Sequence, residues 1–180
     1  MTIGPSEKKP LVSVVIPSYN HELYVRAAIE SVLDSSVKNF EILVVDDGST
    51  DQSVKIVNEM KDPRLKLFTQ KNMGAHEAIN RGVSLAAAPW IAILNSDDRF
   101  HPRKLEMHLE LHASNPHLEA SASRVRYIYE DGKPVPSDGY LAWRYGEAKR
   151  SYSGGKSLWI SLIQTNHLVT TSSLFIGKAS

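Results

Sequence analysis

The sequence predicts an α/β domain with a mostly parallel sheet flanked by helices. Between residues 11 and 115, short β-branched, apolar runs alternate four times with helix-forming stretches. Such alternation is typical of an open parallel sheet with right-handed crossovers. A length of 180 residues is enough for one domain with a sizeable core.

The first half of this pattern has three strands and two helices. Leu11–Pro17 and Glu41–Val45 are apolar on both faces, as expected of buried parallel strands, and Leu65–Phe68 is a shorter third strand. An apolar stripe from Val25 to Leu33 predicts the first helix. Ser49 and Gln52 have capping-box spacing, which predicts that a second helix with Val54 and Val57 starts there.

The second half adds Gly74–Leu85 as a third helix and Trp90–Leu94 as a fourth strand. Pro102 is expected as the first residue of a helix that reaches about Asn115. After Pro116 the pattern changes. We expect a hairpin over Glu119–Tyr129 with a turn at Glu130–Lys133, a loop over Pro134–Gly155, a short helix over Ser157–Gln164 and a strand over Thr171–Ile176.

Composition excludes several classes of protein. A formal net charge of +1 gives no field that would attract nucleic acid, and the absence of cysteine excludes disulfides and cysteine-based metal sites. Met1–Pro10 lacks the apolar core of a signal peptide, and no apolar stretch approaches the about 20 residues that span a bilayer. We therefore expect a cytoplasmic protein whose membrane contact, if there is any, is peripheral.

Polar residues follow the carboxyl end of each of the four predicted strands. In open α/β sheets ligands bind at this edge, so the four segments are expected to meet there. The segments are Pro17–Asn20, Asp46–Asp51, Lys71–Gly74 and Asn95–Asp98.

The acidic pair Asp97–Asp98 comes directly after a buried strand. Adjacent carboxylates repel each other unless a cation or hydrogen-bond donors compensate, and Mg²⁺ or Mn²⁺ often shares carboxylates with substrate phosphates. The alternative is a solvated turn with a helix cap, which an isolated Ser-Asp-Asp would favour. The position beside three other polar strand ends favours the metal site.

The other polar segments have structural alternatives too. Gly48 permits a sharp turn and Ser49 or Asp51 can cap a helix, so a mixed structural and binding role is expected for the Asp46–Asp51 segment. Gly74 would let backbone approach a phosphate at a helix start, whereas a solvated or packing role is at least as credible for Arg81. His108 and His112 are interpreted as a wet helix face rather than a zinc site.

Taken in order, these segments resemble the inverting family 2 glycosyltransferases with a GT-A fold. The resemblance is close over Pro10–Asn115 and much looser to Ser180. It rests on Val14-Val15-Ile16-Pro17-Ser18-Tyr19-Asn20, Val44-Val45-Asp46-Asp47-Gly48-Ser49-Thr50-Asp51, Asn72-Met73-Gly74 with Ala78, Asn80, Arg81 and Gly82, and Ile93-Leu94-Asn95-Ser96-Asp97-Asp98.

The resemblance implies that the chain binds a nucleotide-sugar donor, often a UDP-sugar, together with Mn²⁺ or Mg²⁺. Asp47 matches the carboxylate that holds the base, with Asp46 close by, and Asp97 matches a ribose contact. Asp98 is the first choice for the metal, with Asp97 second, while Asn95 departs from the usual Asp. The remaining donor-site residues are expected to be Pro17, Tyr19, Asn20, Asn72, Gly74 and Arg81.

The implied reaction is a single displacement that transfers the sugar to the hydroxyl of a glycan or lipid-linked acceptor, as in polysaccharide or glycan biosynthesis. The general base of such enzymes lies in a downstream acidic motif, so it is expected beyond Ser180. Residues 1–117 would form the nucleotide-sugar-binding part, and residues 118–180 the truncated beginning of the acceptor side, within one continuous domain. His167 could line that side or be structural.

Three alternatives remain open. A sugar nucleotidyltransferase shares the layout, but it would normally have a glycine-rich, basic segment where Pro17–Asn20 stands. A non-catalytic nucleotide-sugar-binding module would lack only turnover. A receiver-like signalling domain would need a lysine at a later strand end, and none fits convincingly.

Overall fold

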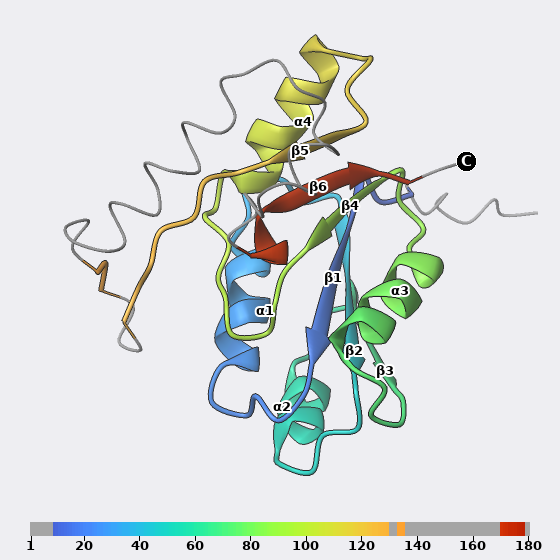
Figure 1. The fold of residues 1–180 in the computed structure, drawn as a ribbon, viewed down its shortest axis with the longest axis vertical. Helices are drawn as coiled ribbons and strands as arrows, with labels where there is room; N and C mark the ends of the chain where they lie inside the picture. Colours follow the sequence, from blue (N-terminus) through green and yellow to red (C-terminus); the bar gives the residue numbers. More distant parts are fainter. Residues whose placement is uncertain (1–8, 130–132, 136–169, 179–180) are drawn as a thin grey trace, which may run out of the picture. The chain divides into compact units, whose positions relative to one another are not determined.

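A computed structural model describes residues 9–129, 133–135 and 170–178 of the chain, and Figure 1 draws its fold. The chain divides into two units, Met1–Ser121 with Leu174–Ser180, and Ala122–Ser173. Among the described residues, the first unit contains almost all of the regular structure. The predicted boundary between residues 117 and 118 stays a prediction.

Within the described residues, the sheet has six strands in the order β3-β2-β1-β4-β6-β5. The first four strands of the chain run parallel to one another, and β6 is antiparallel to β4. This confirms the predicted α/β class with a mostly parallel sheet. The strands are β1 (Val12–Ser18), β2 (Phe40–Asp46), β3 (Leu65–Thr69), β4 (Trp90–Ile93), β5 (Ala120–Ala122) and β6 (Leu174–Gly177).

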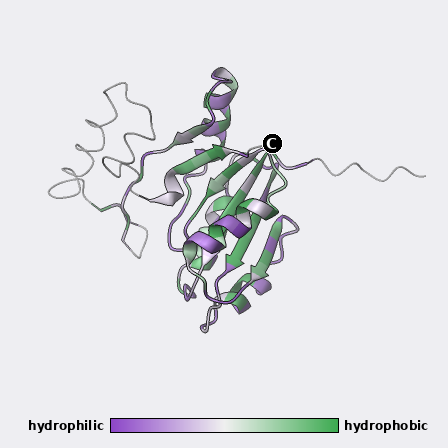
Figure 2. Cartoon of the chain, turned by 45° about the vertical axis from the view of Figure 1, so that its right-hand side comes forward, coloured by the Kyte–Doolittle hydropathy of each residue, from purple (hydrophilic) through white to green (hydrophobic). Residues whose placement is uncertain are grey.

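Helices cover both faces of this sheet, and β1 and β2 are buried along their whole length. Alternate β1 residues belong to two apolar clusters, one with α1 and the other with the residues of α3. Figure 1 shows α1 and α3 on opposite sides of β1, and Figure 2 shows that the strands of the sheet are predominantly hydrophobic. The helices are α1 (Val25–Leu33), α2 (Ser53–Glu59), α3 (Ala75–Leu85) and α4 (Lys104–Ser114).

Helix α3 lies very close to the sheet. A Cβ atom added at Gly82 would overlap the side chain of Val15, which is fully buried in β1. Only a residue without a side chain permits this approach, because both backbones are held by regular hydrogen bonding. The close packing fixes the position of the start of α3 relative to the end of β1.

Two predicted helix starts are wrong in detail. The Ser49–Gln52 capping box does not form, and α2 has no side-chain bond at its N-cap, Gln52. Ser49 instead donates both its N–H and its hydroxyl to Asp46, since the sharp turn at Gly48 brings them together. Helix α4 begins at Lys104, two residues after Pro102.

The two histidines of α4 are not on a wet face, contrary to the prediction. His108 and His112 are each 4% exposed. The His108 ring stacks on Phe175 with centroids 4.8 Å apart, and the His112 ring lies 4.2 Å from that of Trp90. Strand β6, which supplies Phe175, covers this face of the helix, and it comes about sixty residues later in the chain.

A chain of hydrogen bonds joins these two rings to Ser121 and Lys104. His112 Nδ1 is 3.1 Å from the Leu118 carbonyl and therefore donates to it, and His112 Nε2 is 2.9 Å from the Ser121 hydroxyl oxygen. His108 Nδ1 is 2.7 Å from the same hydroxyl oxygen, and His108 Nε2 is 3.4 Å from Lys104 Nζ. Burial, together with the charge of Lys104, lowers the pKa of His108 to about 4, so the His108 ring is neutral and its Nε2 can accept from Lys104.

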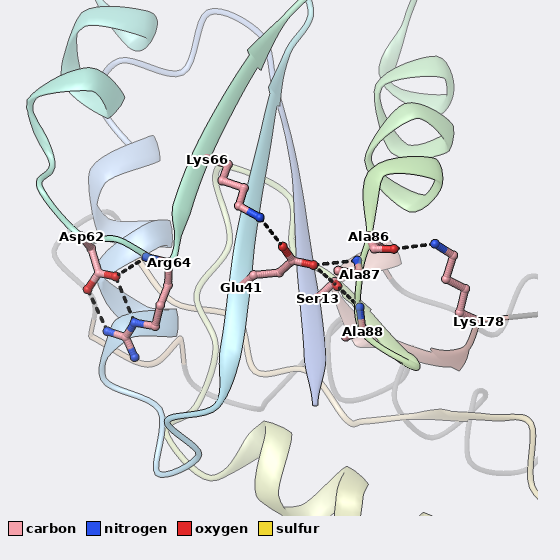
Figure 3. Close-up of polar contacts among 9 residues, drawn as sticks. All are labelled: Ser13, Glu41, Asp62, Arg64, Lys66, Ala86, Ala87, Ala88 and Lys178. Atoms are coloured by element: carbon pink, nitrogen blue, oxygen red, sulfur yellow. Dashed lines mark hydrogen bonds and ion pairs between the residues drawn. The ribbon is translucent and has the colours of Figure 1, made fainter. Parts of the chain in front are cut away.

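A second buried polar cluster surrounds Glu41 near the amino ends of β1 and β2 (Figure 3). Its carboxylate accepts from the Ser13 hydroxyl at 2.7 Å, the Ala87 N–H at 2.7 Å and Lys66 at 2.9 Å. Burial acts to raise the pKa of Glu41, but these hydrogen bonds outweigh it and hold the pKa below its usual value. The cluster ties β1, β2, β3 and the α3–β4 connection together.

The second unit is described only in part. Ile128 and Pro134 form an antiparallel bridge, as in the predicted hairpin. The predicted strand over Thr171–Ile176 begins instead as a 3-10 helix at Thr171–Ser173 and continues as β6. The centre of the turn at 130–132, the loop residues 136–155, the short helix over 157–164 and His167 lie outside the described residues. Among the residues that are described, no helix is long and apolar enough to cross a membrane.

Candidate functional site

A cavity of about 510 Å³ opens where the carboxyl ends of β1 and β4 diverge. The sheet order places β2 and β3 on one side of β1 and β4 on the other, so this is the point where a crevice forms in an open α/β sheet. All of its lining residues belong to the first unit. They are Pro17, Ser18, Tyr19, His21, Asp47, Asn72, Gly74, Ala75, Ala78, Asn95, Ser96 and Asp97.

The four predicted polar segments therefore meet at one cavity. Of the ten residues proposed from sequence, six line it: Pro17, Tyr19, Asp47, Asn72, Gly74 and Asp97. The other four, Asn20, Asp46, Arg81 and Asp98, are in or near the same segments but are not among the lining residues.

Asp47 is buried and organises the wall formed by the start of α3. Its Oδ1 accepts from Gln70 Nε2 at 2.8 Å and from the Met73 N–H at 2.9 Å, and its Oδ2 accepts from the Gly74 N–H at 2.7 Å. Burial acts to raise the pKa of Asp47, but these three bonds outweigh it and hold the pKa below its usual value. The carboxylate is therefore ionised at neutral pH.

Two glycines make this arrangement possible. Gly48 has a φ of 79° and Gly74 a φ of 95°, a region that side chains disfavour. A Cβ at Gly48 would stand 3.0 Å from the Asn72 backbone nitrogen. The turn after β2 and the segment before α3 can therefore lie against each other.

Asp46 and Asn20 act within the scaffold. Asp46 is buried and accepts from both the N–H and the hydroxyl of Ser49, as described above. Asn20 has a φ of 52°, and its Oδ1 accepts from the Thr50 N–H at 2.8 Å. Both residues stabilise the turns that follow β1 and β2. Asp46 therefore has a different role from its neighbour Asp47, which binds the segment before α3.

The acidic pair lies at the tip of β4. Asp97 is exposed and lines the cavity, whereas Asp98 is half-buried and accepts from Asn95 Nδ2 at 3.3 Å. The Asp98 N–H also bonds the Asn95 carbonyl, which closes a tight turn. Asn95, which stands where the family usually has Asp, therefore donates a hydrogen bond to Asp98 from an uncharged side chain.

These carboxylates fit a hard divalent cation. Among the described residues no group of three or more His, Asp or Glu side chains converges on one point. Mg²⁺-type ions are commonly held by one or two carboxylates plus substrate phosphates and water. The pair at the tip of β4 meets that requirement with an exposed carboxylate facing the cavity.

Arg81 lies away from this cavity, on the second turn of α3. Its guanidinium donates to the Thr69 carbonyl at 2.8 Å and to Gln70 Oε1 at 3.3 Å. Because Gln70 in turn donates to Asp47, Arg81 supports this wall of the cavity through Gln70.

Six lining residues were not among the ten proposed site residues. They are Ser18, His21, Ala75, Ala78, Asn95 and Ser96. His21 follows the Pro17–Asn20 segment directly, which was the one available signal. The hydroxyl of Ser18 is buried and, within the described part of the chain, has no hydrogen-bond partner. Its backbone carbonyl accepts from the Asp47 N–H at 2.8 Å.

The cavity lies at the crevice position of an open α/β sheet, and sequence comparison assigns the chain to a family of glycosyltransferases. A sequence model of glycosyl transferase family 2 matches residues 13–173. The chain belongs to this family, and the resemblance to its N-terminal part is confirmed.

Curated relatives point the same way. An uncharacterized glycosyltransferase of Haemophilus influenzae is 42% identical over 129 residues, which cover 70% of this chain and 51% of that protein. The chondroitin synthase of Escherichia coli is 34% identical over 136 residues, which cover 74% of this chain and 20% of that protein. The chain thus spans about a fifth to a half of the length of such relatives.

Solved structures confirm the GT-A fold. Staphylococcus aureus TarS in complex with UDP superposes with a TM-score of 0.62 at 26% identity, covering 69% of this chain and 38% of that one. The mannosyltransferase PcManGT of Pyrobaculum calidifontis, in complex with GDP-Man and Mn²⁺, has a TM-score of 0.61 at 22% identity, covering 67% and 37%.

Proposed function

We propose that this chain binds the UDP part of a UDP-sugar in the cavity between β1 and β4, as the donor-binding part of an inverting glycosyltransferase. The observation that carries the proposal is the meeting of four polar strand ends at one cavity, with carboxylates on two of its walls. TarS, a relative in structure at 26% identity, has been solved with UDP and with UDP-GlcNAc. Family membership favours glycosyl transfer over the nucleotidyltransferase alternative.

The nucleobase end is assigned to Tyr19, Asn72 and Asp47. A carboxylate offers about four acceptor positions. Three of those on Asp47 are taken by Gln70, Met73 and Gly74, and Oδ2, which accepts only from Gly74, keeps one. That position can accept the imide N–H of uracil. The exposed ring of Tyr19, 45% accessible, can cover a base.

The diphosphate end is assigned to Asp97 and Asp98. These side chains would hold Mn²⁺ or Mg²⁺, which stabilises the charge that develops on the leaving diphosphate. The acceptor is proposed to be the hydroxyl of a glycan, in keeping with the chondroitin synthase relatives. No described residue is assigned as the general base.

The test is a calorimetric titration of the 180-residue chain with UDP, with and without Mn²⁺, alongside UMP as a matched ligand that lacks the second phosphate. We expect Mn²⁺ to strengthen UDP binding much more than UMP binding, and Asp98→Asn to remove most of that gain. A folded chain that does not bind UDP, or that binds UDP and UMP with the same metal dependence, contradicts the proposal.

A further inference from the structure

The loop that follows β1 is fastened tightly to the loop before α2. The His21 N–H donates to Ser53 Oγ at 3.0 Å, and the Glu22 N–H donates to Asp51 Oδ2 at 2.9 Å. In return, Glu22 accepts from the Gln52 N–H at 2.8 Å. The backbone of His21 is therefore held by the β2–α2 segment, and its carbonyl also accepts from the Tyr24 and Val25 N–H groups at the start of α1.

The side chain of His21 reaches in the other direction, to the tip of β4. Its Nδ1 is 2.6 Å from the hydroxyl oxygen of Ser96, a residue 75 positions later. The ring is half-buried, packs edge-on against Tyr24 with centroids 5.9 Å apart, and lines the cavity. Ser96 is only 1% exposed, so water competes little for this bond.

The position of Ser96 makes this contact relevant to the acidic pair. Ser96 is the residue directly before Asp97, inside the turn closed by the bond from the Asp98 N–H to the Asn95 carbonyl. Asp97 is exposed, so the position of its carboxylate depends strongly on the backbone of this turn. The His21–Ser96 bond joins a side chain of this turn to the opposite wall of the cavity.

We propose that His21 is a positioning residue for the metal-assisted step of donor binding: by holding Ser96, it fixes the turn that presents Asp97 and Asp98. This inference rests on the proposed function of the cavity. Removing the His21–Ser96 bond should weaken only the metal-dependent part of UDP binding, because the nucleobase wall around Asp47 is held by hydrogen bonds that do not involve His21. The metal-dependent gain in UDP affinity should fall, while metal-free UDP affinity stays the same.

The test uses five variants of the 180-residue chain: His21→Ala, Ser96→Ala, the double variant, and the two isosteres His21→Asn and His21→Gln. Asn places its amide where Nδ1 of histidine lies and Gln places it where Nε2 lies. We expect His21→Ala to lower the Mn²⁺-dependent gain in UDP affinity about five-fold, the effect of one hydrogen bond. His21→Asn should restore the gain and His21→Gln should not.

The double variant separates a shared bond from two independent effects. If His21 acts through Ser96, the double variant should be no weaker than the weaker single variant. Additive losses, or equal losses with and without Mn²⁺, overturn the inference. A purely structural role would lower thermal stability and would weaken UDP binding equally with and without Mn²⁺.

A second readout needs no ligand. Hydrogen exchange of the Asp97 and Asp98 amides should be faster in His21→Ala and Ser96→Ala than in the wild type, and unchanged exchange overturns the inference. If the wild-type chain fails to bind UDP with Mn²⁺, the proposed function falls and this role falls with it. If the wild type binds and the variants match it, only the role of His21 is refuted.

Discussion

Replacing Asp47 with Asn separates the structural work of this carboxylate from its proposed contact with the donor. Asp47 accepts from Gln70, Met73 and Gly74. An Asn side chain has one oxygen and one NH₂ group. If the oxygen serves Gln70 and Met73, the NH₂ faces the Gly74 N–H, and the opposite orientation loses two bonds instead of one.

The cost follows from these contacts. An N–H left without an acceptor in a buried site costs about 1–3 kcal/mol, and hydrogen bonds to a charged group are about twice as strong as neutral ones. Since the Gly74 N–H is half-buried, we expect Asp47→Asn to lower the free energy of unfolding by about 2–3 kcal/mol at neutral pH. Urea unfolding followed by circular dichroism measures this.

Asp97→Asn is the matched control, because Asp97 is exposed and lies on the same cavity. Its effect on unfolding should stay within about 0.5 kcal/mol. The pKa of Asp47 is held below its usual value, so its stabilising effect is present above the unfolded-state pKa and is lost as pH falls through the folded-state value. The difference between wild type and Asp47→Asn should therefore shrink on acidification. Equal stability of the two Asn variants at neutral pH refutes this assignment.

Three further predictions concern the scaffold. Glu41→Gln should lower the free energy of unfolding by about 1–3 kcal/mol at neutral pH. Because the pKa of Glu41 is held below its usual value, the wild type loses this stabilisation as pH falls, and the variant should depend less on acid. Urea titrations across acidic pH measure both effects. Gly82→Ala should destabilise by about 1–2 kcal/mol in thermal unfolding, because overlap with Val15 exceeds the gain in helix propensity. Burial lowers the pKa of Lys104 to about 8, so stability should rise with pH above that value, and Lys104→Met should abolish the rise.

The parallel sheet could be predicted because its strands are buried on both faces. β1 and β2 read as continuous apolar runs, and each ends at a polar tip. Chain order and the topology of open sheets then bring these tips to one edge. This is why six of the ten proposed site residues line one cavity without any contact having been known.

The roles of neighbouring residues could not be predicted in the same way. Asp46 and Asp47 are adjacent and chemically identical, and only the turn at Gly48 decides that Asp46 binds Ser49 while Asp47 binds the segment before α3. Local sequence offered a capping box at Ser49, but the carboxylate three residues earlier competes for the same hydroxyl.

Long-range contacts explain the remaining differences. The prediction of a wet face for His108 and His112 failed because Phe175, which covers them, comes from a strand far along the chain. The contact between His21 and Ser96 joins residues 75 positions apart. Neither pairing has a periodic or local signal, so both depend on the folded topology.

We propose, most centrally, that the polar residues after strands β1 to β4 bind a nucleoside diphosphate through a shared cation in the cavity between β1 and β4. A crystal structure of the chain with UDP and Mn²⁺ tests it most directly. We expect uracil to lie against Asp47 and Tyr19, and Mn²⁺ to contact both the diphosphate and Asp97 or Asp98. UDP bound elsewhere, or a cation that touches neither carboxylate, would contradict it.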